Sequence, residues 1–351
     1  QFSKQLGTTR NADYLRELFR KGYLEHNTLT DATRYIANQL FAKYGLVIVD
    51  GDDKDLKQLF VPYINRELTE QVSFHSVSNT ISDLEKTYKV QVNPREINLF
   101  YLDDNSRERI ILENGIYKVN NTAITFSKEE ILQKVKESPQ LFSPNVIMRP
   151  LYQEVILPNL AYIGGGGELA YWLELKAYFD EVQVPFPILL LRNSVQVISE
   201  KQQKKLDNLN ISSEEIFLSL NDLLKQKINE NSEIEFNFLD AKTILEQQFY
   251  MLRRVTNNTD ASFIGAVDAQ EKKQLNGLIN LEKRLLRAEK RKQQDLVDRI
   301  TVLKLQLFPN QSLEERQRNF SEYYLEYGDA FIDALKSTLK PLDLKFTILE
   351  L

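Results

Sequence analysis

The chain has 351 residues, of which 42% are hydrophobic and 27% charged, and its formal net charge is −5. This acidic balance argues against a nucleic-acid-binding protein, because phosphate binding needs clustered Lys and Arg. With no cysteine and only two histidines, His26 and His75, the chain is expected to form no disulfide and no metal site. No run approaches the ~20 apolar residues of a membrane helix, so we expect a cytoplasmic protein without membrane contact.

The first part of the chain predicts helices followed by one strand. Residues 11–41 have a helical pattern, with Thr28 or Thr30 as a cap. Residues 46–49 are a β-branched run that predicts a buried parallel strand. Asp50 follows at its carboxyl end, where ligands usually bind an α/β sheet, and is therefore a candidate site residue. Alternatively, Asp50 and Asp52 only form a turn and cap the next helix.

The next segment, residues 71–143, predicts a small β-rich insertion. It contains short strand-like runs at 96–102, 109–112, 117–119 and 123–126. Glu113-Asn-Gly115 and Asn120-Asn121 are turn signals between these runs. After the insertion, strands are predicted at 145–148, 161–163 and 187–191. The βα pattern on both sides predicts an α/β fold with a doubly wound, Rossmann-like core.

Four successive glycines join the strand predicted at 161–163 to a helix that begins near Glu168. Because glycine has no Cβ, its backbone N–H groups can approach an anion or a polar ligand at the start of a helix. The loop matches neither phosphate-binding signature, since Leu169 occupies a position that needs glycine and no Gly-Lys-Ser/Thr follows. Ligand binding and tight strand–helix packing both remain open explanations.

Beyond Ile198 the chain is predicted to be almost entirely helical until a final strand at 344–351. One helix of roughly 40 residues, Ala269 to Phe308, would be about 60 Å long. Its leucines keep a 3-4 spacing with a one-residue slip near Lys292, which predicts a coiled coil and a homodimer. The basic segment 283–292 is interpreted as a solvated face balanced by Glu282, Glu289 and Asp295, or alternatively as an anion or nucleotide site.

An ordered series of motifs resembles the BshC family of bacillithiol-synthesis cysteine ligases along nearly the whole chain. The motifs include Thr28-Leu-Thr-Asp31, Asn98-Leu-Phe-Tyr-Leu102 with Arg107-Glu-Arg109, and Leu307-Phe-Pro-Asn310. The central block runs from Arg149-Pro-Leu-Tyr152 through the glycines to Arg192-Asn-Ser194. Relatives often have proline where this chain has Gly166.

The resemblance implies a ligase that adds cysteine to glucosaminyl-malate through an amide bond, with ATP or another nucleotide as the suspected cosubstrate. It also implies a core like that of class I aminoacyl-tRNA synthetases and a coiled coil that pairs two subunits. We therefore expect core segments at 1–70 and 144–200, the insertion at 71–143 and a helical coiled-coil region at 201–351. The chain lacks a counterpart of the amino-terminal nucleotide motif, so it is expected to be a fragment that is inactive alone.

On the positions that match the family, side-chain chemistry assigns Glu168 as the catalytic candidate, which would orient or deprotonate the acceptor amine. The candidate substrate-binding residues are Gly164, Gly165, Gly166, Gly167, Tyr162, Trp172, Arg149, Arg192, Ser194 and Asp50. Core packing is the alternative role for Trp172. At the level of the whole protein, the alternatives are a non-catalytic coiled-coil interaction protein and a nucleic-acid binder that uses the basic segment.

Overall fold

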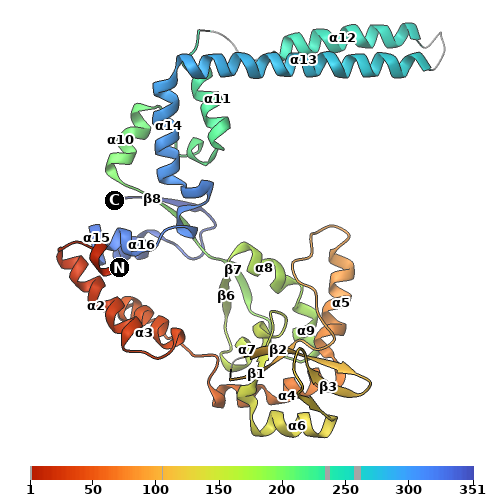
Figure 1. The fold of residues 1–351 in the computed structure, drawn as a ribbon, viewed down its shortest axis with the longest axis vertical. Helices are drawn as coiled ribbons and strands as arrows, with labels where there is room; N and C mark the ends of the chain where they lie inside the picture. The colour runs from red at the N-terminus through yellow and green to blue at the C-terminus, as the bar shows by residue number, and fades with distance from the viewer. Residues whose placement is uncertain (1, 105, 234–237, 257–261) are drawn as a thin grey trace. The chain divides into compact units, whose positions relative to one another are not determined.

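The computed structural model describes residues 2–104, 106–233, 238–256 and 262–351, and the chain divides into two compact units (Figure 1). The first unit contains Gln1–Asn193 and Tyr323–Lys345, and the second contains Ser194–Glu322 and Phe346–Leu351. The chain thus leaves the first unit after Asn193, whereas the sequence placed the start of the helical region at residue 201. A late segment of that region also returns to the first unit.

The amino-terminal part of the first unit is helical, as predicted. It contains α1 (Phe2–Gln5), α2 (Arg10–Leu24) and α3 (Leu29–Phe41). Thr28 caps α3 by accepting a hydrogen bond from the Asp31 N–H at 3.0 Å, which selects it over Thr30. From the late segment come α16 (Asp329–Thr338) and most of α15 (Ser321–Tyr327). The ring of Tyr324 stacks on Tyr14 of α2 at 5.2 Å.

The buried parallel strand predicted at 46–49 is wrong. These residues are extended but pair with no described strand, and the side chains of Leu46, Val47 and Val49 are 46%, 82% and 38% exposed. A parallel strand needs a neighbour for its N–H and C=O groups, and a β-branched sequence cannot supply one. Asp53 then caps α4 (Lys54–Glu70) by accepting hydrogen bonds from two backbone N–H groups.

The β-rich insertion is present as a five-stranded antiparallel sheet in the order β4-β3-β2-β1-β5. Its strands are β1 (Leu99–Asp103), β2 (Ser106–Glu113), β3 (Ile116–Val119), β4 (Thr125–Phe126) and β5 (Phe142–Pro144). The predicted turn between β2 and β3 has positive φ at Asn114 and Gly115, as a two-residue hairpin requires. Helix α5 (Val72–Leu84) precedes the sheet in sequence, and α6 (Lys128–Glu137) lies between β4 and β5.

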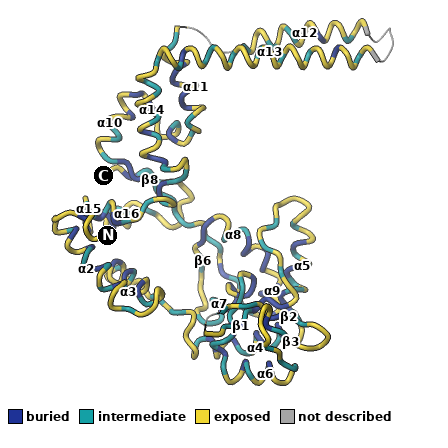
Figure 2. Tube along the Cα trace, viewed as in Figure 1, coloured by how far each residue is buried: buried dark blue, intermediate teal, exposed yellow. Residues whose placement is uncertain are grey.

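The sheet is attached to α4 by buried polar contacts. The Tyr117 hydroxyl donates to the Leu68 carbonyl at 2.7 Å. The buried Glu67 carboxylate accepts hydrogen bonds from the N–H groups of Ser73 and Asn98 and from both of their side chains. Apolar side chains of α4, the sheet and the later helices then form one continuous core, drawn in dark blue in Figure 2.

The parallel strands of the first unit belong to a βαβ segment. Strand β6 (Ala161–Gly164) pairs in parallel with β7 (Ile188–Leu191), and α8 (Gly166–Leu173) and α9 (Lys176–Glu181) connect them. The strand predicted at 187–191 is therefore present but not buried, since Ile188 is 66% exposed. The strand predicted at 145–148 is wrong. The side-chain oxygen of Asn145 accepts hydrogen bonds from the N–H groups of Ile147 and Met148, which makes a turn into α7 (Arg149–Ile156).

The second unit combines a small parallel sheet with helices. Strand β8 (Ser194–Ile198) pairs with β9 (Phe346–Glu350), which confirms the predicted carboxy-terminal strand. Its helices are α10 (Glu200–Asn208), α11 (Leu220–Glu230), α12 (Leu239–Thr256), α13 (Ser262–Lys292) and α14 (Gln294–Leu307). Leucines and isoleucines of α10, α11 and α14 form its core.

The long helix predicted from 269 to 308 is two helices, and it begins earlier than expected. The break falls at Gln293, whose ψ of 37° is not helical, next to the slip in leucine spacing at Lys292. Helices α12 and α13 lie antiparallel (Figure 1), joined by the ion pairs Lys242–Glu282 and Arg253–Glu271. Both are exposed over most of their length (Figure 2).

The carboxylates expected to balance the basic segment 283–292 have other partners. Glu282 pairs with Lys225 and Lys242, and Asp295 lies 3.7 Å from Arg299. Glu289 is buried and accepts a hydrogen bond from Ser232. Among the described residues, none of these three carboxylates forms an ion pair with the basic segment, and most of the basic side chains are exposed as expected.

Candidate functional site

The glycine loop connects the carboxyl end of β6 to the first turn of α8. Gly164 is the last residue of β6 and lies opposite Leu191 of β7. Its carbonyl accepts a hydrogen bond from the Arg192 N–H at 2.9 Å, so the parallel ladder holds Arg192 beside the loop. The two strands thereby bring together the glycine loop and Arg192, which are separated by α8 and α9 along the chain.

The four glycines serve different purposes. A Cβ on Gly164 would lie 2.7 Å from Tyr162 Cε1 and 3.2 Å from the Glu168 Cβ, so this position is glycine because of packing. A Cβ on Gly165 would make only ordinary contacts, at 3.5 Å from Glu168 Oε2 and 3.6 Å from Arg192 Cζ. A Cβ on Gly166 or Gly167 would have no described neighbour within 4 Å. Tight packing therefore explains the first glycine, and open space lies beside the last two.

The first turn of α8 leaves its N–H groups without helical partners, as in any helix. Glu168 uses one carboxylate oxygen to accept the Gly165 N–H at 2.7 Å, so its side chain caps the helix. The side chain is half-buried, and its other oxygen accepts no hydrogen bond from a described residue. The capping role is thus present, and the catalytic role assigned to Glu168 remains a prediction.

Two arginines lie close to this helix. The Arg149 Nη2 donates to the Tyr171 hydroxyl of α8 at 3.3 Å, and Arg192 faces Gly165. Among the described residues, neither guanidinium forms an ion pair with a carboxylate. Both positive charges therefore remain available to an anionic ligand.

The aromatic residues of the site belong to the core. Trp172 is 1% exposed, stacks on Tyr162 at a ring distance of 4.1 Å, and contacts Phe179 and Phe186. Burial raises the pKa of the Tyr162 hydroxyl. The alternative of core packing therefore describes Trp172 in this structure, where it cannot form an open pocket wall. Through this stack it fixes Tyr162, whose ring touches the start of the glycine loop.

Asp50 lies in a turn rather than at the end of a strand. Its Oδ1 accepts a hydrogen bond from the Asp52 N–H at 2.9 Å, and its Oδ2 is 3.8 Å from Arg34. It makes no hydrogen bond or ion pair with the glycine loop, so the structure supports the turn-forming alternative for this residue. The turn is anchored by Tyr152, which donates to the Gly51 carbonyl at 2.8 Å. Burial and the nearby aspartates raise the pKa of Tyr152 to about 12.

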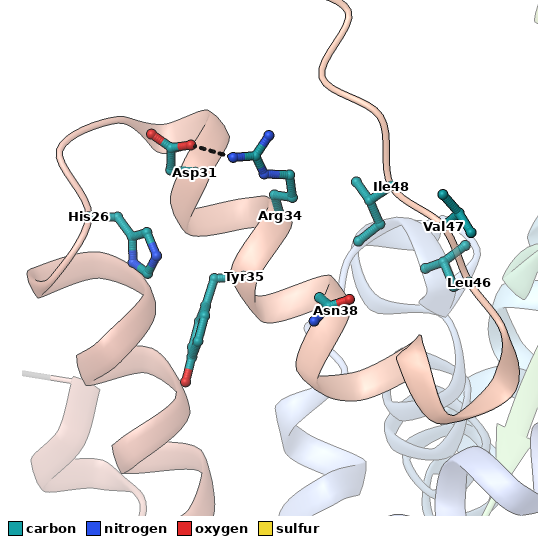
Figure 3. Close-up of a pocket in the computed structure, with 8 residues that line it drawn as sticks. All are labelled: His26, Asp31, Arg34, Tyr35, Asn38, Leu46, Val47 and Ile48. Carbon is teal, nitrogen blue, oxygen red and sulfur yellow. Dashed lines mark hydrogen bonds and ion pairs between the residues drawn. The ribbon is translucent and has the colours of Figure 1, made fainter. Parts of the chain in front are cut away.

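A separate hollow of about 510 Å³ lies between α3 and the extended segment that precedes Asp50 (Figure 3). Its guanidinium, Arg34, is paired with Asp31 at 3.0 Å. The ring of His26 lies 5.1 Å from that of Tyr35, near the start of α3. Because its charged groups already pair with each other, this hollow is a weaker candidate for an anionic ligand than the glycine loop.

Ser194 belongs to the second unit, where it begins β8. Its hydroxyl donates to Glu315 at 3.4 Å, and the other oxygen of Glu315 accepts the Val195 N–H at 3.2 Å. Glu314 accepts the Val197 N–H in the same way, so two carboxylates satisfy the free edge of this strand. The contacts of Ser194 are structural, and its predicted contact with substrate remains untested.

One cationic residue was not given a role by the sequence. Arg107 of β2 belongs to a motif shared with the family, but its position on an exposed strand gave no reason to connect it with Arg149. In the structure, both line one cavity. Only the pairing of β1 with β5 reveals this proximity, because β5 leads directly into the turn before α7.

Two further observations concern the described residues as a whole. They include no group of three His, Asp or Glu side chains arranged to hold a metal ion. In the same parts of the chain, no helix combines the length and the apolar character that crossing a membrane requires.

Comparison with known protein families matches both units. Residues 1–193 match the N-terminal Rossmann-like domain of the bacillithiol biosynthesis protein BshC, and residues 195–351 match its C-terminal coiled-coil domain. Relatives provisionally named cysteine ligase BshC include those of Flavobacterium johnsoniae, 54% identical over 348 residues, and Flavobacterium psychrophilum, 55% identical over 349 residues. Both alignments cover 99% of this chain but 66% of the relative. The relative from Bacillus thuringiensis is 27% identical over 88% of the chain and 58% of its own length.

Proposed function

The chain belongs to the BshC family of bacillithiol biosynthesis, and from this premise we propose that it forms part of a ligase that joins cysteine to glucosaminyl-malate. The new bond would be an amide between the cysteine carboxyl carbon and the amine of the sugar. The bond between that carbon and its activating group would break, and the amine would lose a proton. The chain spans about two thirds of the length of its Flavobacterium relatives, so the proposal concerns the protein of full family length.

The observation that carries this proposal is the open glycine loop. The space beside Gly166 and Gly167 adjoins N–H groups that have no helical partner, and the unpaired guanidinium of Arg192 faces Gly165. Attack of an amine on an activated carboxyl creates negative charge on the carbonyl oxygen. Fixed N–H donors and a guanidinium are the groups that stabilise such a charge.

Glu168 is the candidate base in this arrangement. The acceptor amine must lose a proton as the C–N bond forms, and a carboxylate beside the loop can accept it. Only one oxygen of Glu168 is used by the cap, which leaves the second for this task. Arg149, which reaches the same helix through Tyr171, would pair with a carboxylate of the substrate.

Cysteine must be activated before the amine attacks, and ATP or another nucleotide is the cosubstrate implied by the family resemblance. A phosphate group would fit the free N–H groups of α8 and Arg192, both of which suit an anion. These residues would bind and orient it.

A chimera tests the proposal. This chain would replace the matching 348 residues of the F. johnsoniae relative, and the product would be incubated with ATP, cysteine and glucosaminyl-malate. We expect bacillithiol by mass spectrometry, and at least a tenfold loss of its formation in Arg192→Gln. Arg109→Gln, which removes an exposed charge from β2, is the control. A folded chimera without product, or an unaffected Arg192→Gln, would count against the proposal.

We also propose that α12 and α13 join two copies of the chain. Several of their apolar side chains are exposed, including Tyr250, Met251 and Val255 at 63%, 59% and 66%. Exposed apolar rows on a helical hairpin are typical of a protein–protein interface. The leucine seam of α14 is different: Leu303 is 2% exposed and packs within the second unit.

A further inference from the structure

A cavity of about 500 Å³ in the first unit is lined by residues of the extended segment and the start of α4, of β2, of β5 and of α7. The extended segment contributes Val47 and Val49, while α7 contributes Ile156 and Leu157, and these four side chains form an apolar wall. The lining also contains polar residues, among them Arg107 of β2 and Arg149 at the first position of α7. The cavity is large enough for a molecule the size of a small dicarboxylic acid.

Arg107 is held in place without being neutralised. Its guanidinium lies 3.8 Å from the ring centre of Phe100, and its Nε and Nη2 donate to the Ser143 hydroxyl at 3.3 Å. Nη2 also donates to the Pro144 carbonyl at 3.3 Å. Among the described residues, no carboxylate forms an ion pair with it. Partial burial lowers the pKa of Arg107, although the residue remains exposed.

Arg149 is similar, because its Nη2 donates to the neutral Tyr171 hydroxyl and leaves its charge unpaired among the described residues. The third cation of the lining behaves differently. Lys57 is 3% exposed, forms an ion pair with Asp52 and donates to the Gln140 carbonyl at 2.9 Å. The cavity therefore neutralises its lysine and keeps an excess of two guanidinium charges.

We infer that Arg107 and Arg149 together bind a small molecule with two anionic oxygen groups, and that the apolar wall contacts its carbon skeleton. A guanidinium can bind two oxygens of a carboxylate or a phosphate at once, because its N–H donors form a planar fork. A lysine ammonium is a point charge and lacks this geometry. In the proposed ligase, the ligand group would be the malate part of the acceptor. That identification alone rests on the proposed function.

Calorimetric titration of the chain 1–351 at low salt tests this inference. The probes are L-malate and, separately, inorganic phosphate, with neutral N-acetylglucosamine as the uncharged comparison. We expect malate to bind, and both Arg107→Gln and Arg149→Gln to weaken it at least tenfold. Arg107→Lys keeps the charge but loses the planar fork, so its affinity should fall between those of wild type and Arg107→Gln.

Arg109→Gln is the matched control. Arg109 lies two residues along the same strand and also faces Phe100, at 5.9 Å, but it does not line the cavity. Its removal should leave the affinity within twofold of wild type. Phosphate binding with the same dependence on Arg107 and Arg149 would support the anion site and assign it to a phosphate group instead.

The inference is overturned if neither anion binds at millimolar concentration, or if Arg109→Gln weakens binding as much as Arg107→Gln does. Melting curves of all variants check that the fold is intact, and the charge-preserving Arg107→Lys gives an answer even where Arg107→Gln unfolds. The titration contains no cysteine and no ATP. It can therefore succeed while ligation fails, or fail while ligation succeeds.

Discussion

At the scale of single residues, Glu168 shows how one carboxylate can serve structure and chemistry together. The oxygen that accepts the Gly165 N–H fixes the side chain at the start of α8. A base held by such a contact has a defined direction, which a flexible surface carboxylate lacks. The two roles predict different consequences when the charge is removed.

We expect Glu168→Gln to keep the cap, because the amide oxygen still accepts the Gly165 N–H. Unfolding free energy should therefore fall by about 0.5–2 kcal/mol at most. In the active chimera, kcat/KM should fall on the order of a hundredfold if Glu168 transfers a proton. Steady-state kinetics with melting curves separate the two effects. Wild-type kinetics in a folded variant would leave Glu168 with the capping role only.

A second prediction concerns the buried Glu67. Burial raises the pKa of this carboxyl, although four hydrogen bonds from Ser73 and Asn98 favour its charged form. Glu67→Gln would place an NH₂ group against donors, and we expect it to cost about 1–3 kcal/mol in urea unfolding. Glu70→Gln is the control on the same helix, where an exposed pair with Arg66 should contribute at most about 1 kcal/mol. Equal losses of unfolding free energy in the two variants would mean that the buried hydrogen bonds of Glu67 stabilise the fold no more than the exposed ion pair of Glu70 does.

At the scale of elements, the glycine loop combines a tight crossing with an open helix end. Gly164→Ala would press a Cβ against Tyr162, and we expect it to destabilise the chain by about 1–3 kcal/mol. Gly167→Ala meets no described neighbour within 4 Å and should stabilise by about 0.5–1 kcal/mol. Urea unfolding of the two variants, which carry the same substitution at different positions, measures both changes in stability.

Proline should be tolerated at Gly166. This residue is the first of α8, and the preceding Gly165 has φ −73° and ψ 165°, which suits a residue before proline. We expect Gly166→Pro to stabilise the chain by about 0.4–1 kcal/mol, because it restricts the unfolded state. Gly167→Pro is the comparison. A large loss of stability in Gly166→Pro would show that its N–H is needed.

Helix α14 carries a pH-dependent element in the second unit. Burial lowers the pKa of Lys304 to about 8, despite its contacts with the Ile216 carbonyl and the Phe308 ring. Between pH 8 and about 10.5 the unfolded chain holds this proton and the folded chain releases it, so stability contributed by this group rises with pH. Below pH 8 Lys304 is charged in both the folded and the unfolded state, so the folded state bears the full free-energy cost of burying that charge.

The measurement is the urea midpoint of wild type minus that of Lys304→Met, from pH 7 to 10. We expect this difference to increase as the pH rises. The exposed Lys201→Met on α10 should show no such trend. Parallel pH profiles for wild type and Lys304→Met would contradict the assignment.

At the scale of the whole molecule, the predicted dimer now has a specific surface. Leu285 and Leu303 pack against the core of the second unit, so changing them would test folding rather than association. We expect Met251→Asp with Val255→Asp to give a monomer in light scattering, since both side chains are exposed on α12. Gln247→Asp with Gln248→Asp adds the same charge without removing apolar surface. A wild-type monomer at micromolar concentration would contradict the proposed dimer.

The sequence by itself determined what depends on local order. A cap at Thr28 or Thr30, the Asn-Gly turn and the 3-4 leucine spacing predicted a helix start, a hairpin and the helical region, because caps, turns and periodicity are properties of neighbouring residues. The slip at Lys292 even marked the break between α13 and α14. The family resemblance implied the reaction that we propose, which local patterns could not.

The tertiary structure decided which segments meet. Residues 46–49 have strand composition but pair with no described strand, and Asn145 turns an apolar run into the start of a helix. Asp50 forms a turn, while Arg107, 42 positions before Arg149, lines the same cavity. These outcomes depend on contacts between distant parts of the chain. The free energy of such contacts comes from tertiary packing, which local sequence patterns do not reveal.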